Sequence, residues 1–465
     1  MDQKLEINMK HFRYILTGIL ISIVVLGGCE ISSDVGAPPS NGTINNTMFV
    51  SIGNSLTAGF QSGVLKESNQ RYSFPNLIAQ QLGIPSDNFV QPIIPDPGIG
   101  TPITITSLNP PALETGMAAT NPSNSNHPRP FNNLGIPGAI LYDALDTSSI
   151  QARSATRGNP FYMVVMRNQA AFGKSMIEQA TKLGPTFMTF WLGNNDVLGY
   201  ATSGGTKGTN LGLGGTTPRT LPTEKIVFKQ LFEGALSMLM ASNPNANIVV
   251  ANIPNVTDVP FFTTVPIKIP NPTDPSKLLD IYYKKNDGSV AVAQPGDYVL
   301  LTAQAVIGTG PNRSMGLHPL TPLDSKYVLD SAEVAIATQA VKDFNEIIGK
   351  FAQDKSIPLV DINAEFAAIK AAGYSVAGQV FTTDFITGGL FSLDGVHPSS
   401  RGYGIVANMF IKKMNEAFSA NIPFVDIIDL PGIPIPAGKI GRGYQPGMTI
   451  APGTFDSMIS MFLGE

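Results

Sequence analysis

Residues 48–60 read Met-Phe-Val-Ser-Ile-Gly-Asn-Ser-Leu-Thr-Ala-Gly-Phe, an apolar and β-rich run that ends in a turn of small residues. Such a run is typical of a short strand buried on both faces of a parallel sheet. A serine at a strand-to-helix turn presents its hydroxyl and a free backbone amide to the same point in space. Ser55 is therefore a candidate nucleophile, although a serine at this position is also an ordinary helix N-cap.

Further apolar runs with the same kind of ending lie downstream, and helical patterns separate them. The strand-like runs occupy residues 186–192, 247–253 and 357–362, and the helical patterns occupy residues 75–82, 172–183, 225–241, 331–354 and 401–418. Strands that alternate with helices predict an α/β fold in which helices cover both faces of an open parallel sheet. Ligands of such sheets bind beyond the carboxyl ends of the strands, so the residues after each strand are candidates for chemistry.

Other segments lack this pattern. Residues 91–130 are dense in Pro, Asn and Thr, residues 200–222 are rich in Gly and Thr, and residues 258–330 mix Pro turns with a β-like run at 297–306. We interpret these three segments as insertions at the sheet edge or over the site. Residues 423–465 are interpreted as an extended C-terminal arm.

The composition excludes several classes of function. Of the 465 residues, 43% are hydrophobic and 14% are charged, so the chain can bury a large core. With 30 Lys and Arg against 34 Asp and Glu, the formal charge of -4 leaves no basic excess for binding nucleic acid. A single Cys excludes an internal disulfide framework and cysteine-rich zinc or iron–sulfur sites, and four His leave few metal ligands. Nothing implies a cofactor, and we assign no metal ligands.

The N-terminus has the layout of a signal peptide. An apolar stretch at residues 15–25 follows Lys10 and Arg13, is too short to span a bilayer, and ends in Leu-Gly-Gly before Cys29. This ending resembles the lipobox of bacterial lipoproteins, which are cleaved before a lipid-modified Cys. The resemblance implies a signal peptide at residues 1–28, a lipid anchor on Cys29 and an extracytoplasmic protein, periplasmic or on the cell surface. The alternative is a buried apolar helix with an incidental Cys.

The segment that follows the anchor is rich in Ser, Asn, Gly and Pro. Such a composition is typical of a flexible linker. We therefore expect residues 29–46 to form a flexible tether.

Two further turns place amide donors where a ligand of the sheet would lie. Asn195 stands in Gly-Asn-Asn-Asp at residues 193–196, directly after the run 186–192. Asn side chains in such turns usually cap backbone groups, but an amide at a strand's carboxyl end can also point at an oxyanion near Ser55. Gly138 could bring its backbone amide close to a ligand, or it could be an ordinary turn glycine.

Residues 394–399 read Asp-Gly-Val-His-Pro-Ser and precede a helical pattern. A carboxylate three residues before an imidazole can hold the Nδ1–H of the ring, which leaves Nε2 free to take a proton from a serine. Asp394 and His397 are therefore candidate catalytic residues. Of the remaining histidines, His11 lies in the predicted signal peptide. We assign structural roles to His127 and His318.

In this order, the four motifs resemble those of the SGNH hydrolases, also called the GDSL esterase/lipase family. The family's Gly-Asp-Ser-Leu matches residues 53–56 except that Asn54 replaces Asp. Three other blocks match residues 133–138, 193–196 and 394–398, and residues 251–254 resemble a strand-end segment of bacterial members. Each block is degenerate, but five in order are a specific signal.

The resemblance implies a flavodoxin-like three-layer α/β/α hydrolase domain at residues 47–422. Asn54 lies beside the nucleophile, so we expect its replacement of Asp to affect local hydrogen bonding rather than chemistry.

The resemblance also implies a role for each matched site residue. Ser55 would be the nucleophile, His397 the base, and Asp394 the group that orients the imidazole. The oxyanion donors would be the backbone amides of Ser55 and Gly138 and the side chain of Asn195.

These roles predict serine-dependent hydrolysis of carboxylic esters through an acyl-enzyme. The expected substrates are acyl lipids or acetylated carbohydrates, and the expected membrane contact is through the lipid anchor. The alternative is a non-catalytic binding protein displayed at the surface on the same fold, which the large insertions favour and the complete set of four motifs disfavours.

Overall fold

The computed structural model describes residues 38–465 except 109, 207–220, 272–273, 435–447 and 464–465. The chain divides into two units, Met1–Ser40 and Asn41–Glu465, and the fold lies in the second. The expected signal peptide and Cys29 lie outside the described residues. In the part of the chain that the structure describes, no helix is long and apolar enough to cross a bilayer.

Five parallel strands form the central sheet, in the spatial order β16-β9-β8-β1-β7. They are β1 (Phe49–Gly53), β7 (Asn133–Gly135), β8 (Phe187–Trp191), β9 (Asn247–Ala251) and β16 (Leu359–Val360). Counted along the chain from the β7 edge, the order is 2-1-3-4-5, which is the flavodoxin-like arrangement. The predicted fold class is confirmed. The structure adds the short edge strand β7, which the sequence pattern did not indicate.

The two central strands are fully buried, which explains their continuous apolar runs. Each carries one polar residue in its middle, Ser51 in β1 and Thr189 in β8. Their side-chain oxygens lie 2.6 Å apart and share a hydrogen bond, so the two hydroxyls satisfy each other inside the sheet.

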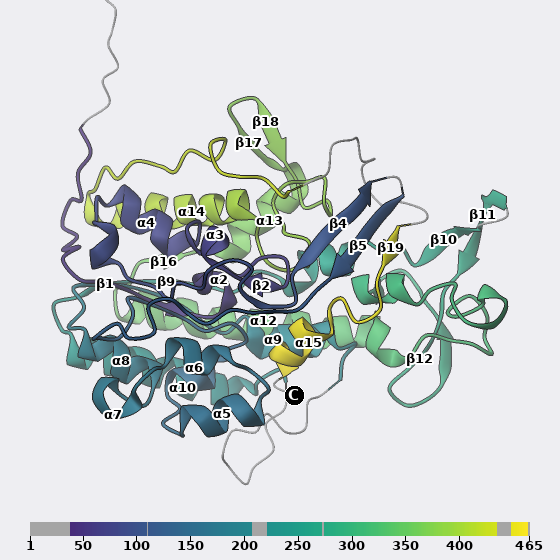
Figure 1. Cartoon of the computed structure of the whole chain (residues 1–465), viewed down its shortest axis with the longest axis horizontal. Coiled ribbons are helices and arrows are strands. Elements are labelled where there is room, and N and C mark those ends of the chain that lie inside the picture. The colour runs from purple at the N-terminus through teal and green to yellow at the C-terminus, as the bar shows by residue number, and fades with distance from the viewer. Residues whose placement is uncertain (1–37, 109, 207–220, 272–273, 435–447, 464–465) are drawn as a thin grey trace, which may run out of the picture. The chain divides into compact units, whose positions relative to one another are not determined.

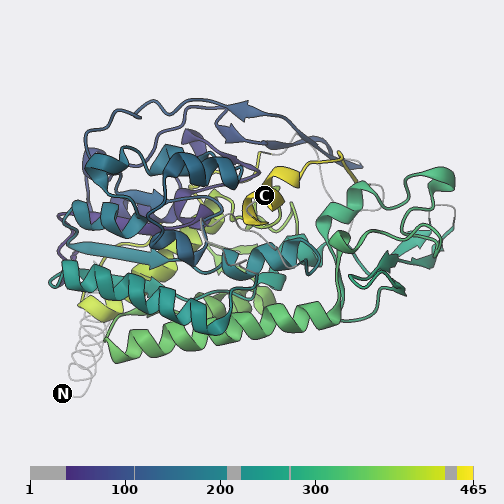
Figure 2. The same ribbon diagram turned by 90° about the horizontal axis from the view of Figure 1, so that it is seen from below.

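Helices cover both faces of the sheet, as predicted. They include α4 (Phe74–Gln81), α8 (Met176–Lys182), α9 (Asn195–Thr202), α10 (Lys225–Ser242), α12 (Ser331–Asp354), α13 (Ile362–Ala372) and α14 (Ser400–Phe418). Figure 1 shows α4 and α14 on one side of the sheet and α8 and α10 on the other. Figure 2 shows the long helix α12 beside α10, where the rings of Phe228 and Phe344 stack 3.8 Å apart.

Further elements complete the unit. The helices are α2 (Ser55–Ala58), α3 (Glu67–Gln70), α5 (Ile150–Thr156), α6 (Phe161–Val165), α7 (Gln169–Phe172), α11 (Pro260–Thr263) and α15 (Asp456–Leu463). The strands are β2 (Val64–Leu65), β3 (Ile99–Gly100), β4 (Ile103–Leu108), β5 (Pro111–Thr115), β6 (Ala118–Ala119), β10 (Lys268–Asn271), β11 (Asp274–Asp280), β12 (Tyr282–Lys284), β13 (Val290–Val292), β14 (Tyr298–Val299), β15 (Val328–Leu329), β17 (Tyr374–Val376), β18 (Gln379–Phe381) and β19 (Thr449–Ile450).

The expected β-like run at residues 297–306 is mostly not a strand. Only Tyr298–Val299 pairs, as β14, and the chain then enters the 3-10 helix Leu301–Ala305. The Leu300 amide still bonds across to Tyr327 O, and the Ala303 amide then bonds back to Leu300 O, which begins the turn. Leu300, Leu301 and Ala303 are buried in the turn rather than in a sheet.

Both ends of the unit are more ordered than the sequence suggested. Residues 41–46, expected to be tether, pack on the unit: the Thr43 amide donates to Phe418 O at 2.9 Å, and Ile44 is buried. In the expected C-terminal arm, β19 pairs with β5, and α15 buries Met458, Met461, Phe462 and Leu463. These apolar residues recur at helical spacing, which is the reason the segment forms a helix.

Candidate active site

Ser55 stands where β1 passes into the short helix α2. Asn54 is the N-cap of α2, and its Oδ1 accepts a hydrogen bond from the Leu56 amide at 3.0 Å. Ser55 is thus the first helical residue and not the cap, which leaves its hydroxyl free of a capping role. Gly53 permits the tight turn, because a Cβ there would lie 1.9 Å from Thr57 Oγ1.

Asp394 and His397 form a buried pair. Asp394 Oδ2 lies 3.0 Å from His397 Nδ1, and Oδ1 accepts bonds from the amides of Val396 and His397 at 3.0 and 2.8 Å. Burial alone would raise the pKa of the Asp394 carboxyl, but the His397 ring and these hydrogen bonds hold that pKa below its usual range. The carboxylate is therefore the stable form, and it can fix the orientation of the imidazole.

Contacts between distant segments bring His397 to the serine turn. The ring of Phe60, just after α2, lies 4.9 Å from the His397 ring. The Tyr403 hydroxyl, in α14, donates to Phe60 O at 2.8 Å. The Ser62 amide donates to Ser392 Oγ at 2.9 Å. The segment after β1 and the segment before α14 are therefore joined by both packing and hydrogen bonds.

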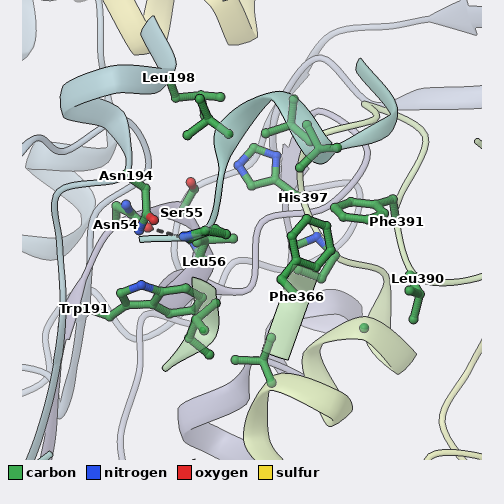
Figure 3. Close-up of a pocket in the computed structure, with 18 of the residues that line it drawn as sticks. Asn54, Ser55, Leu56, Trp191, Asn194, Leu198, Phe366, Leu390, Phe391 and His397 are labelled. Atoms are coloured by element: carbon green, nitrogen blue, oxygen red, sulfur yellow. Dashed lines mark hydrogen bonds between the residues drawn. The ribbon is translucent and has the colours of Figure 1, made fainter. Parts of the chain in front are cut away.

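Ser55 and His397 line the same pocket (Figure 3). Asp394 occupies Nδ1 of the ring, whereas Nε2 is buried and has no hydrogen-bond partner among the described residues. The Ser55 hydroxyl and the His397 ring are not hydrogen-bonded to each other in this structure. Hydrogen bonds between a nucleophile and its base are often long without substrate and shorten in the reactive complex. The side chains are only 2% and 1% exposed, so the pair is shielded from bulk water.

Asn195 and Gly138 lie beyond the carboxyl ends of β8 and β7. Asn195 is the first residue of α9, and its Nδ2 donates to Ala139 O at 2.9 Å. Asn195 also lines the pocket that contains Ser55, whereas Gly138 does not. Within the part of the chain that the structure describes, the backbone amides of Ser55 and Gly138 donate no hydrogen bond. Both amides are thus unused donors.

Asn54 and Asn194 leave unsatisfied amide groups in this pocket, near Ser55 in Figure 3. Asn54 Nδ2 and both polar side-chain atoms of Asn194 are buried without a partner among the described residues. An unsatisfied buried polar group costs about 1–3 kcal/mol. At residue 54 the amide oxygen still caps α2, so the change from the expected Asp retains the cap and adds a buried N–H₂ group.

The rest of the pocket wall is apolar. The cavity has a volume of about 110 Å³, and α13, α14 and the loop before α14 form much of the wall. The apolar residues that line it include Trp191, Leu198, Val259, Phe366, Phe391 and Val406. Phe261 and Phe262 are buried core residues, and only Val259 of residues 259–262 lines the pocket.

Helix α15 packs beside His397 and the loop of Gly138. The Phe462 ring lies 5.9 Å from the His397 ring. A Cβ on Gly138 would lie 2.5 Å from Met461 Cγ and 2.8 Å from Met461 O. The C-terminal helix therefore shields both the imidazole and the loop of Gly138. Sequence reasoning missed this element, although the spacing of Met458, Met461 and Phe462 was a signal for it.

The other described histidines lie apart from this pocket. His127 stacks on Phe131, and burial, aided by Arg129 and Arg167, lowers its pKa. His318 Nδ1 accepts a bond from the Leu320 amide at 3.2 Å. His11 lies outside the described residues. Among the residues that the structure describes, no group of three or more His, Cys, Asp or Glu side chains could hold a metal ion.

The fold and these side chains are those of a carboxylic ester hydrolase built on a flavodoxin-like sheet. The family model for GDSL-like lipases/acylhydrolases matches residues 49–410, and the chain belongs to that family. No curated protein matches the chain.

Several solved structures match the chain at low identity. A catalytic mutant of an acetylxylan esterase from Geobacillus stearothermophilus is 13% identical over 79% of this chain and 94% of that one, with a TM-score of 0.31. Phospholipase A1 from Streptomyces albidoflavus is 13% identical over 80% and 99%, with a TM-score of 0.33. A putative GDSL-like lipase from Parabacteroides merdae is 13% identical over 81% and 99%, with a TM-score of 0.32.

Proposed function

We propose that this hydrolase cleaves carboxylic esters with Ser55 as nucleophile, His397 as general base and Asp394 as the group that orients His397. One observation carries the proposal: the Asp394–His397 pair, 3.0 Å apart, leaves a free Nε2 in the same pocket as the Ser55 hydroxyl. A serine hydroxyl is a weak nucleophile at neutral pH and needs such a base.

The reaction follows from these positions. His397 Nε2 takes the proton as Ser55 Oγ attacks the ester carbonyl, and Asp394 stabilises the resulting imidazolium. The imidazolium then gives this proton to the departing alcohol oxygen, which leaves an acyl group on Ser55. A water molecule, deprotonated by the same imidazole, attacks the acyl-enzyme. The imidazolium then returns this proton to Ser55 Oγ as the bond between Oγ and the acyl carbon breaks, which releases the carboxylic acid and restores the enzyme.

Three donors are proposed to stabilise the tetrahedral intermediate: the amides of Ser55 and Gly138 and the side chain of Asn195. The two amides have no other acceptor among the described residues. One N–H of Asn195 is used by Ala139 O, which leaves the second N–H of the amide for the oxyanion. A single such donor can lower the barrier by about 3–4 kcal/mol.

The pocket wall favours an apolar acyl chain as the group that enters it. Aromatic and aliphatic side chains dominate the wall around Ser55, and binding there gains free energy in proportion to the apolar area buried. An acetyl group would contact less of this apolar wall than a longer acyl chain would. Between the two substrate types expected from the sequence, we therefore propose acyl esters over acetylated carbohydrates.

The test is hydrolysis of chromogenic acetate and octanoate esters by the chain from residue 30 onward. The octanoate should have the higher kcat/KM, and Ser55→Ala should abolish both activities while the exposed control Ser68→Ala retains them. A fluorophosphonate probe should label the parent and not Ser55→Ala. If the parent hydrolyses no ester and takes up no probe, the chain is a non-catalytic binding protein.

We also propose that the mature protein is extracytoplasmic and is tethered to a membrane by a lipid on Cys29. The support is the sequence of residues 15–29. Incorporation of labelled palmitate in cells should be lost in Cys29→Ser, together with membrane association. Lipid labelling that persists in this variant would disprove the anchor assignment.

A further inference from the structure

Buried side chains hold the loop between β7 and the 3-10 helix Leu141–Ala144. Three successive carbonyls of this loop, those of Pro137, Gly138 and Ala139, each accept a hydrogen bond from a different side chain. The donors are, in that order, Asn159 (2.8 Å), Arg157 (3.3 Å) and Asn195 (2.9 Å). Of these donors, only Asn195 lies in one of the sequence motifs.

The backbone amides of the same loop are also occupied, with one exception. The Ala139 amide donates to Ile136 O, the Ile140 amide to Asp143 Oδ2 and the Leu141 amide to Asp196 Oδ2, at 3.0, 2.8 and 2.8 Å. Within the described residues only the Gly138 amide of this loop has no acceptor. A loop so fully bonded therefore presents a single free donor.

We propose that Asn159 is a positioning residue, which orients and polarises the Pro137–Gly138 peptide so that the Gly138 amide acts as an oxyanion donor. The peptide unit is planar and trans, so the Pro137 carbonyl and the Gly138 N–H point in opposite directions. A hydrogen bond that holds the carbonyl therefore also directs the N–H. It makes this N–H a stronger donor as well, because hydrogen bonds at the two ends of one peptide polarise each other. The inference rests on the proposed oxyanion role of Gly138.

Asn159 is itself held in one orientation. Its side chain is 1% exposed, and its Oδ1 accepts a bond from the Phe161 amide at 3.0 Å. Its backbone carbonyl accepts from Ser154 Oγ at 2.7 Å. With Oδ1 engaged by Phe161, the amide can present only Nδ2 to Pro137 O. The segment around α5 and α6 thereby supplies a rigid donor to the site.

Arg157 completes the support from the same segment. Its Nη1 lies 2.7 and 2.8 Å from the Asp143 oxygens, both side chains are fully buried, and Asp143 in turn accepts from the Ile140 amide. A buried ion pair contributes little net stability, because the cost of removing two charges from water offsets their attraction. Nη2 of Arg157 donates to the Gly138 carbonyl, and this contact agrees with a role of Arg157 in orienting the loop.

Gly138 must be glycine for this arrangement. Its φ of +79° lies in the left-handed region, and a Cβ there would lie 2.9 Å from Asn159 Nδ2. Any side chain would displace the Asn159 amide as well as strain the backbone. The hydrogen bond of Asn159 to this peptide therefore requires glycine at position 138.

The test compares Asn159→Leu with Asn408→Leu, a matched control outside the site. Asn408 is also buried, and it too bonds a backbone segment, with Nδ2 to Val425 O at 3.0 Å and the Val425 amide to Oδ1 at 2.7 Å. For the octanoate ester, Asn159→Leu should lower kcat about 10- to 100-fold with little change in KM. The inhibition constant of octylboronic acid, which mimics the tetrahedral intermediate, should rise by a similar factor. Asn408→Leu should leave kcat and the inhibition constant unchanged, whatever its effect on Tm.

A second variant keeps the test decisive if Asn159→Leu does not fold. In Asn159→Asp, a protonated carboxyl can donate to Pro137 O and a carboxylate cannot. The kcat of this variant relative to the parent should therefore fall as the pH rises. A kcat equal to that of the parent in both variants, or a loss matched by Asn408→Leu, would overturn the inference. Failure of the proposed function looks different, since the parent itself would then be inactive.

Discussion

The Phe462 ring of α15 lies 5.9 Å from the His397 ring, so the C-terminal helix packs against the imidazole of the site. Phe462 is fully buried, and Met461 beside it packs against Gly138. Exclusion of water from this side strengthens every electrostatic interaction of the imidazole.

Phe462→Ala should therefore lower both stability and activity. Removal of a buried Phe side chain costs about 3–5 kcal/mol of the free energy of unfolding, which urea denaturation measures. The kcat should fall as well, because the His397 ring loses a packing partner. Phe424→Ala, at a 56% exposed position, is the control and should change neither quantity. Unchanged kcat in folded Phe462→Ala would show that α15 does not contribute to the site.

Asp394→Asn should retain the nucleophile and lose most of the rate. The amide cannot stabilise the imidazolium, and it favours the wrong tautomer of His397, so kcat should fall by about 10³–10⁴. The exposed Asp354→Asn serves as control. A loss of less than tenfold, measured on the octanoate ester, would remove Asp394 from the proposed mechanism.

The ionisation of Asp196 should lower the free energy of unfolding as the pH rises from about 4 to 7. Burial raises the pKa of its carboxyl to about 7, against the hydrogen bonds from Thr223 Oγ1 and the Leu141 amide, which lower it. Between the unfolded and folded pKa values, the folded state retains a proton that the unfolded state has released. Raising the pH therefore favours unfolding across this range.

The measurement is Tm against pH for the parent and for Asp196→Asn, which cannot ionise. The Tm of the parent should fall relative to the Tm of the variant between pH 4 and 7. The difference between the two Tm values should become constant above pH 7. Parallel curves would show that Asp196 ionises in the folded protein as readily as in the unfolded chain.

Val406→Phe should shift the substrate preference toward short acyl chains. Val406, on α14, lines the apolar pocket, and a larger ring there would occupy space proposed for the chain. The kcat/KM for octanoate should fall about tenfold, while that for acetate changes little. Met238→Phe, at an exposed position outside this pocket, is the control. Equal losses for both esters would place the acyl chain elsewhere.

Much of the fold could be predicted because its signals are local. The long helix α12 begins and ends where its periodicity predicted, and the runs that became β1, β8 and β9 are mostly apolar. The strand β7 has only three residues, Asn133–Gly135, too few to show a pattern. The prediction of a β-like run at 297–306 was mostly wrong, because β-like composition does not distinguish a strand from a buried turn.

The candidate site could be predicted in part for the same reason. Asp394 and His397 are three residues apart, so one turn of backbone brings their side chains together. Asn159 and Phe462 carry no such local signal, since Asn159 acts on a loop 22 positions earlier and Phe462 reaches the site from the C-terminal arm.

By itself, the sequence determined the parallel α/β fold and the family motifs, because hydrophobic period and turn chemistry act over a few neighbouring residues. Tertiary structure alone decided that His397 shares a pocket with Ser55, that α15 covers them, and that Asn159 holds the peptide of Gly138. These contacts join segments whose separation along the chain leaves no trace in composition, and they form only when packing brings the buried surfaces together.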